Sequence, residues 1–80
     1  MRNNYPSNPA RSLVLADIAT RLPYNTNDSV VMYAWREAAQ SGRVKQVVSE
    51  MIDQIKDNAD TMRSLLGFDL YNLVIKYSSL

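Results

Sequence analysis

The sequence predicts an all-α fold, a compact bundle of four to five short helices. Apolar residues recur at intervals of three and four along most of the chain, as they do on one face of a helix. Residues that cap or end helices separate these stretches. Hydrophobic residues make up 46% of the 80 residues, which is enough for one folded core. We therefore expect a flexible arm over residues 1–8 and a single helical domain over residues 9–80.

The first predicted helix begins at Pro9 and ends before Pro23. Asn8 can cap it, and Pro9 fits the first turn of a helix. Pro23 ends it, because a proline disfavours the helical conformation of the preceding residue. Its apolar face is expected to carry Val14, Leu15, Ile18, Ala19 and Leu22.

The second predicted helix runs from about residue 29 to residue 41. A polar turn precedes it, and we expect one of the residues 25–28 to cap it. Gly42 stands where a left-handed residue ends a helix. We interpret Trp35 as a core residue rather than an interface anchor. The expected apolar stripe consists of Val31, Ala34, Trp35 and Ala38.

A third helix follows Gly42 almost at once and shows the most regular helical pattern of the chain. Residues 58–60 interrupt this pattern and offer a new cap, so a short helix is expected over residues 61–66, ending at Gly67. The tail from Phe68 fits a further helix, because a single strand would find no partner here. The apolar positions of the third helix are Val44, Val47, Val48, Met51, Ile52 and Ile55.

The residue inventory argues against an enzyme. The chain has no Cys and no His, which excludes disulfides, Cys/His zinc sites, haem ligation and every catalytic pair that needs these residues. Two Gly are too few for a Gly-rich phosphate loop. The closest acidic residues, Asp53, Asp57 and Asp60, do not match a calcium loop. We expect no enzymatic activity, no cofactor and no metal site.

The lack of a secretory signal and the lack of Cys lead us to expect a cytoplasmic protein, and net charge and hydropathy argue against binding to a polyanion or a membrane. A formal net charge of +1 creates no strong field for a polyanion or an acidic membrane surface. The longest apolar run is too short to span a bilayer, and no apolar stretch of the secretory type follows the first residues. The absence of Cys is compatible with the same location.

The charged residues near Gly42 form two groups. Basic residues gather around this glycine, and acidic residues follow at helical intervals further along the third helix. They are either ordinary solvated helix faces or two patches through which a near-neutral protein docks on copies of itself or on a related domain. The candidate interface residues are Arg36, Arg43, Lys45, Glu50, Asp53 and Asp57.

Residues 31–44 resemble the central part of the bacterial effector-associated domains. In that family an apolar helix with aromatic and Ala residues ends in a Gly-Arg-aliphatic turn, matched here by Gly42-Arg43-Val44. An aliphatic helix and a break with Asn follow, matched by residues 47–52 and Asn58. Upstream, Ile18-Ala19 resembles an Ile-Ala pair that family members often show. The resemblance covers residues 15–60.

The resemblance implies a death-domain-like adaptor without catalytic residues or cofactor. Such adaptors pair like with like and bring an effector, such as a protease, a TIR module or an ATPase, to its sensor in bacterial defence or signalling. The implied partner is therefore the same or a related helical domain, with a homo-oligomer as one outcome, and neither a membrane nor a nucleic acid.

Two alternatives to an adaptor function remain. The second helix, Gly42 and the third helix form a tight helix-turn-helix, which is typical of DNA-binding modules. Against this, position 43 is Arg where such turns bury an aliphatic residue, and Glu50, Asp53 and Asp57 would repel phosphates. The other alternative is a small phage or regulatory protein that binds a host enzyme.

Overall fold

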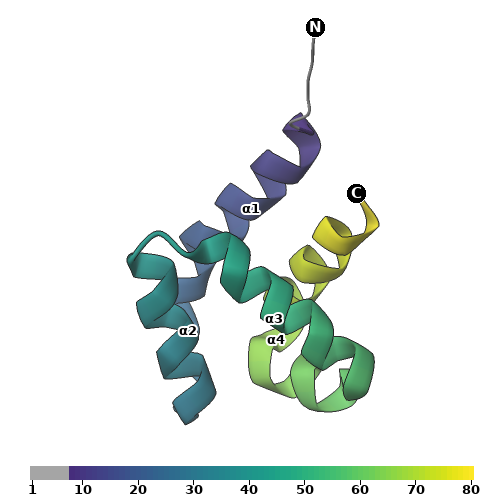
Figure 1. Ribbon diagram of the computed structural model, residues 1–80. Helices are drawn as coiled ribbons and strands as arrows, with labels where there is room; N and C mark the ends of the chain where they lie inside the picture. Colours follow the sequence, from purple (N-terminus) through teal and green to yellow (C-terminus); the bar gives the residue numbers. More distant parts are fainter. Residues whose placement is uncertain (1–7) are drawn as a thin grey trace, which may run out of the picture.

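The computed structural model describes residues 8–80, and these form a bundle of α-helices with no strand among them. In Figure 1, α3 crosses the bundle in front of α4, α2 lies at one side, and the start of α1 lies near the end of α4. The all-α prediction is confirmed. Of the predicted arm, residues 1–7 lie outside the described residues. The elements are α1 (Pro9–Arg21), the 3₁₀ helix η1 (Leu22–Tyr24), α2 (Val30–Gln40), α3 (Val44–Asp57) and α4 (Ala59–Ser79).

Local sequence signals set both ends of α1. The side-chain oxygen of Asn8 accepts hydrogen bonds from the backbone N–H groups of Ala10, at 3.0 Å, and Arg11, at 3.4 Å. These bonds satisfy N–H groups that have no partner inside the helix. At the other end the chain tightens into η1, which contains Pro23. The predicted cap and the predicted position of the end are both confirmed, but Leu22 before Pro23 keeps helical angles, φ −55° and ψ −42°, so the expected loss of helical conformation before the proline does not occur.

The cap of α2 is Ser29, so the prediction of a cap within residues 25–28 is wrong. The Ser29 hydroxyl accepts a hydrogen bond from the N–H of Met32 at 3.2 Å. The side chains of Asn25 and Asn27 make hydrogen bonds within the loop that precedes α2. The Asn25 side chain accepts from the N–H of Asn27, and the Asn27 side chain accepts from the N–H of Ser29, both at 2.8 Å. Such local bonds favour a turn over a helix start.

The buried face of α2 also differs from the predicted stripe. Met32 is fully buried and Trp35 is 5% exposed, whereas Val31 is 40% exposed and Ala34 faces solvent. Periodicity could not decide between these faces, because every residue from 30 to 35 is apolar. Trp35 is confirmed as a core residue.

The turn from α2 to α3 is closed by Gly42, as predicted. Its φ of +86° lies in the left-handed region that favours glycine. The N–H of Gly42 donates to the carbonyl of Ala39 at 3.0 Å, and the N–H of Arg43 donates to that of Ala38 at 2.9 Å. This pair of bonds is a Schellman motif, which satisfies the carbonyl groups at the end of α2.

Helix α4 is kinked at Gly67, where the sequence predicts the end of a short helix. Asn58 caps its start by accepting a hydrogen bond from the N–H of Thr61 at 3.2 Å. Gly67 has φ +82° and ψ +164°, which interrupts the helix before the tail continues as a second helical segment. The side-chain amide of Asn25 donates to the carbonyls of Leu65 and Leu66, at 3.4 and 3.0 Å. The helical prediction for the tail is confirmed.

One apolar core joins all the helices. No polar or charged residue is buried among residues 8–80, so burial of apolar surface is the main force that holds the fold together. None of the helices there has the length and apolar character needed to cross a bilayer. The buried residues are Val14, Ile18, Leu22, Met32, Trp35, Val47, Val48, Met51, Met62, Leu66, Leu70, Val74 and Tyr77.

The kink predicts a specific cost for replacing Gly67. Gly67→Ala should lower the free energy of unfolding by about 1–3 kcal/mol, because this backbone conformation strains any residue with a Cβ. Urea unfolding followed by circular dichroism measures this. Ser64→Ala, at an exposed position one turn earlier, should change the free energy by less than about 0.5 kcal/mol. Equal stability of the two variants would contradict the role given to Gly67.

Candidate interaction surface

Of the six predicted interface residues, Arg36 makes hydrogen bonds within its own chain. Its guanidinium donates to the backbone carbonyls of Asn25 and Asn27, both at 3.0 Å, and the side chain is half-buried. These bonds fix the loop before α2 against the helix and help to set the rotation of α2. The structure therefore gives Arg36 a positioning role within the chain, and whether it also contacts a partner stays a prediction.

Glu50 also has a partner inside the molecule. One oxygen of its carboxylate accepts a hydrogen bond from the indole N–H of Trp35 at 2.9 Å, and the other lies 3.5 Å from the side-chain amide of Gln46. The bond to Trp35 joins α2 to α3 and satisfies the polar atom of a buried aromatic side chain. Part of the predicted acidic stripe is therefore used to hold the fold.

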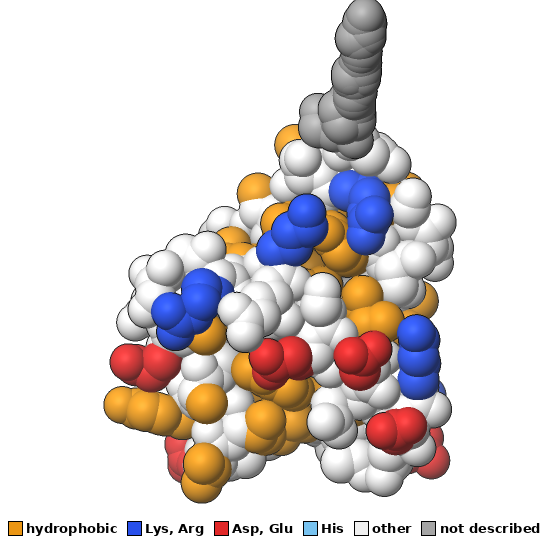
Figure 2. Space-filling view, viewed as in Figure 1, with side chains coloured by type: hydrophobic (Ala, Val, Ile, Leu, Met, Phe, Trp, Pro, Cys, Tyr) orange, Lys and Arg blue, Asp and Glu red, His pale blue; other side chains and the backbone are white. Residues whose placement is uncertain are grey.

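The other four predicted residues remain at the surface. Arg43 and Lys45 lie at the start of α3, Asp53 and Asp57 lie further along it, and all four are exposed. Figure 2 shows basic side chains over the upper part of one face and acidic side chains in a band below them, with basic ones again at the right edge. None of the four takes part in an ion pair within residues 8–80. The ion pairs there are Arg21–Asp17, Arg21–Asp69 and Arg63–Asp60.

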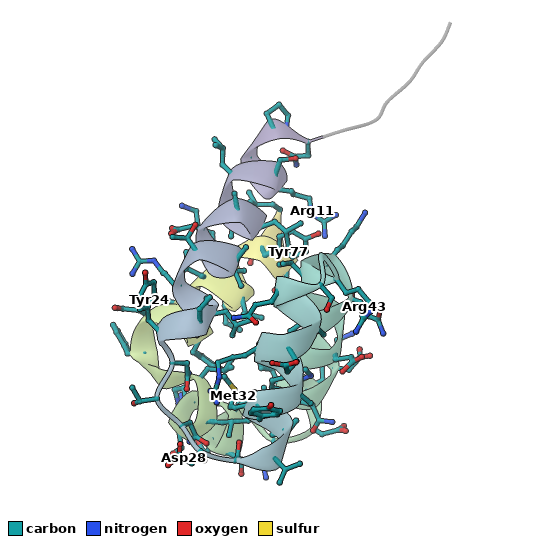
Figure 3. All side chains as sticks on the ribbon, turned by 90° about the vertical axis from the view of Figure 1, so that its left-hand side faces the viewer. Arg11, Tyr24, Asp28, Met32, Arg43 and Tyr77 are labelled. Carbon is teal, nitrogen blue, oxygen red and sulfur yellow. The ribbon has the colours of Figure 1, made fainter. Side chains whose placement is uncertain are left out.

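Arg11 adds a basic group that the sequence analysis did not identify. Its guanidinium lies over the ring of Tyr77, 4.4 Å from the ring centre, and joins the start of α1 to the end of α4. Figure 3 shows Arg11 and Arg43 on the same side of the molecule. No spacing rule could have found this pair, because only folding brings α1 to this side.

A second feature that the sequence analysis missed is the outward side of α2. Val30 is 86% exposed and Tyr33 is 61% exposed, and Ala34 faces solvent as well. Together with Glu37 these residues lie three and four apart, so they share one side of the helix. We call this side, Val30, Tyr33, Ala34 and Glu37, the α2 outer face. The available signal was the uninterrupted apolar run from residue 30 to residue 35, which is wider than one helix face.

A hollow lies at the kink of α4. It has a volume of about 400 Å³ and is lined by Arg21, Tyr24, Asn25 and residues 66–70. Tyr24 and Phe68 are both highly exposed at this hollow. The hydrogen bond and the negative charge of Asp17 raise the pKa of Arg21, so this guanidinium stays charged at any physiological pH.

The side chains that line this hollow combine aromatic, amide and charged groups. Its lining residues include aromatic rings, an amide and an Arg–Asp pair, but no nucleophile with an adjacent base. No cluster of three acidic residues that could hold a metal ion occurs within residues 8–80, Asp53, Asp57 and Asp60 included. The described part of the chain exposes both charged and apolar side chains.

The chain matches no family model, no curated protein and no solved structure. The resemblance of residues 31–44 to the effector-associated domains therefore stays a prediction.

The bond between Trp35 and Glu50 can be tested by its contribution to stability. Glu50→Ala should lower the free energy of unfolding by about 1–3 kcal/mol, because it leaves a buried N–H without an acceptor. Glu50→Gln keeps an acceptor and should lose less. Chemical unfolding followed by the fluorescence of the single Trp measures both.

Asp53→Ala is the matched control, because Asp53 is exposed and lies on the same helix without a side-chain hydrogen bond to residues 8–80. It should leave the stability nearly unchanged. If Glu50→Ala behaved like Asp53→Ala, the structural role given to Glu50 would be wrong.

Proposed function

We propose that the protein is a non-catalytic adaptor domain that acts by binding a second copy of itself or a related helical domain. The observation that supports this is the arrangement of charge on α3. Arg43 and Lys45 at its start, and Asp53 and Asp57 further along, are exposed and make no ion pair within residues 8–80. The acidic surface of one molecule can therefore receive the basic surface of another.

The distance between the two groups supports contacts between molecules rather than within one. Lys45 and Asp57 are twelve residues apart on one helix, which corresponds to about 18 Å. At physiological ionic strength, charges are screened over about 8 Å, so the two groups do not neutralise each other. Each stays available to a partner of opposite charge.

The biological setting is proposed from the resemblance alone. Effector-associated domains are death-domain-like adaptors that recruit an effector to a sensor in bacterial defence or signalling, and we propose the same role here, in the cytoplasm. The left-handed Gly42 followed by Arg43 and Val44 agrees with the turn on which the resemblance depends. This part of the proposal concerns the partner, and the charge argument does not depend on it.

The connection of α2 to α3 keeps DNA binding as a second candidate. Only residues 41–43 join the two helices, as in a helix-turn-helix. However, α3 exposes Asp53 and Asp57, which phosphates would repel. Retention on duplex DNA at moderate salt would favour this candidate, and a stable complex with a host enzyme would favour a regulatory protein.

Reversing the charge at the start of α3 tests the adaptor proposal. Arg43→Glu should weaken self-association by at least about tenfold and leave the fold intact, because the side chain is exposed and its loss removes a charged contact. Sedimentation equilibrium over a concentration series measures this, and circular dichroism checks the fold. The wild-type association should also weaken as salt is added.

Lys76→Glu is the matched control, because it causes the same change of net charge at an exposed position on α4. It should have little effect on association. If Arg43→Glu and Lys76→Glu acted equally, or if salt had no influence, the charge-based mechanism would be refuted.

A further inference from the structure

Helix α2 carries more apolar side chains than the core buries. A stretch of helix that is apolar on all sides is normally covered on all sides, and residues 30–35 of α2 form such a stretch. In α2, only the side of Met32 and Trp35 is buried, whereas Val30 and Tyr33 are 86% and 61% exposed. No other element within residues 8–80 covers the α2 outer face. Association with another molecule would bury this surface and release the water around it.

Four exposed positions on this side of the molecule are spaced by the same intervals whether they are counted from the start or from the end of α2. Val30, Ala34 and Glu37 of this face and Ser41, the C-cap that follows the helix, lie at intervals of four, three and four, and all are exposed. When a second α2 lies antiparallel across this face, position 30 meets position 41 and position 34 meets position 37. Such a contact has two-fold symmetry, with the axis between Ala34 and Glu37. Tyr33 adds an aromatic ring to the same face.

The charges at the two ends of α2 complement this arrangement. Asp28 precedes the helix and Arg43 follows it, so an antiparallel arrangement brings the acidic end of one copy to the basic end of the other. Figure 3, seen from the side on which α2 lies, shows Asp28 and Arg43 at opposite ends of the helix. Both are exposed, and neither takes part in an ion pair within residues 8–80.

The charges also select the orientation. In an antiparallel pair, Asp28 of each copy lies against Arg43 of the other. In a parallel pair, Asp28 would face a second Asp28, and Arg43 a second Arg43, which is repulsive at both ends. Charge complementarity therefore favours a second copy in the antiparallel orientation.

We propose that a second copy of this chain covers the α2 outer face, with the two α2 helices antiparallel and with Asp28 of each copy paired to Arg43 of the other. This inference rests on the self-association in the proposed function, but it replaces the docking of charges on α3 with the α2 outer face as the surface through which self-association takes place. It also makes a distinct claim. Docking along α3 gives Arg43 a partner in Asp53 or Asp57, whereas the α2 pair gives it Asp28.

Complementary charge reversal separates the two arrangements. Asp28→Arg and Arg43→Glu should each weaken self-association by at least about tenfold, because both ends of the pair become repulsive. An equimolar mixture of the two variants should associate within about threefold of the wild-type affinity. In this mixture one copy has two basic ends and the other has two acidic ends, so both contacts regain opposite charges. Sedimentation equilibrium measures all three samples.

A further variant tests the apolar part of the contact. Tyr33→Ser should also weaken self-association by at least about tenfold, because it removes an aromatic side chain from the centre of the contact. Tyr24→Ser is the matched control: Tyr24 is 81% exposed and lines the hollow at the kink of α4 rather than the α2 outer face. Thermal unfolding followed by circular dichroism should show an intact fold for both variants.

Each outcome decides between the proposals. If Asp53→Arg restores the association of Arg43→Glu and Asp28→Arg does not, the α2 pair is overturned and the proposed function stands. If Tyr33→Ser associates as well as Tyr24→Ser, the α2 pair is overturned as well. If the wild-type chain is a monomer at every concentration, the α2 pair and self-association as the proposed function both fail.

Discussion

The burial of one apolar face of α3 is the interaction on which the rest of the structure depends. Val47, Val48 and Met51 are at most 1% exposed, and α1, α2 and α4 all pack against this helix. Residues 8–80 bury no polar or charged side chain, and the chain has no Cys. A domain of this size has little stability to spare. Apolar surface left outside the core, as on α2, therefore has a clear energetic reason to be covered by another molecule.

Apart from the start of α2, where Ser29 rather than one of the residues 25–28 is the cap, the main breaks between the helices were predictable, because the responsible residues act on their own backbone. Asn8, Gly42, Asn58 and Gly67 cap or interrupt helices through bonds and dihedral angles within a few residues. The rotation of α2 was not predictable. It depends on side-chain contacts to distant residues, such as that from Arg36 to the preceding loop, and its apolar run offers no single preferred face.

The candidate surface was predictable only in part. Helical periodicity correctly placed Lys45 and Asp53 on the solvent side of α3. It could not show that Glu50 binds the indole of Trp35, because that bond depends on how two helices pack. For the same reason it could not bring Arg11 to the side of Arg43. Composition led us to expect association, and folding determined which surfaces are exposed.

The most direct test of the central claim, that a second copy covers the outward side of α2, is a concentration series of backbone amide spectra by nuclear magnetic resonance. A chain of 9.1 kDa is well suited to this measurement. The predicted result is that the signals of residues 28–37 and of Arg43 shift together with concentration while those of Asp53 and Asp57 stay in place. Shifts at Asp53 and Asp57 with a constant α2 would contradict the claim.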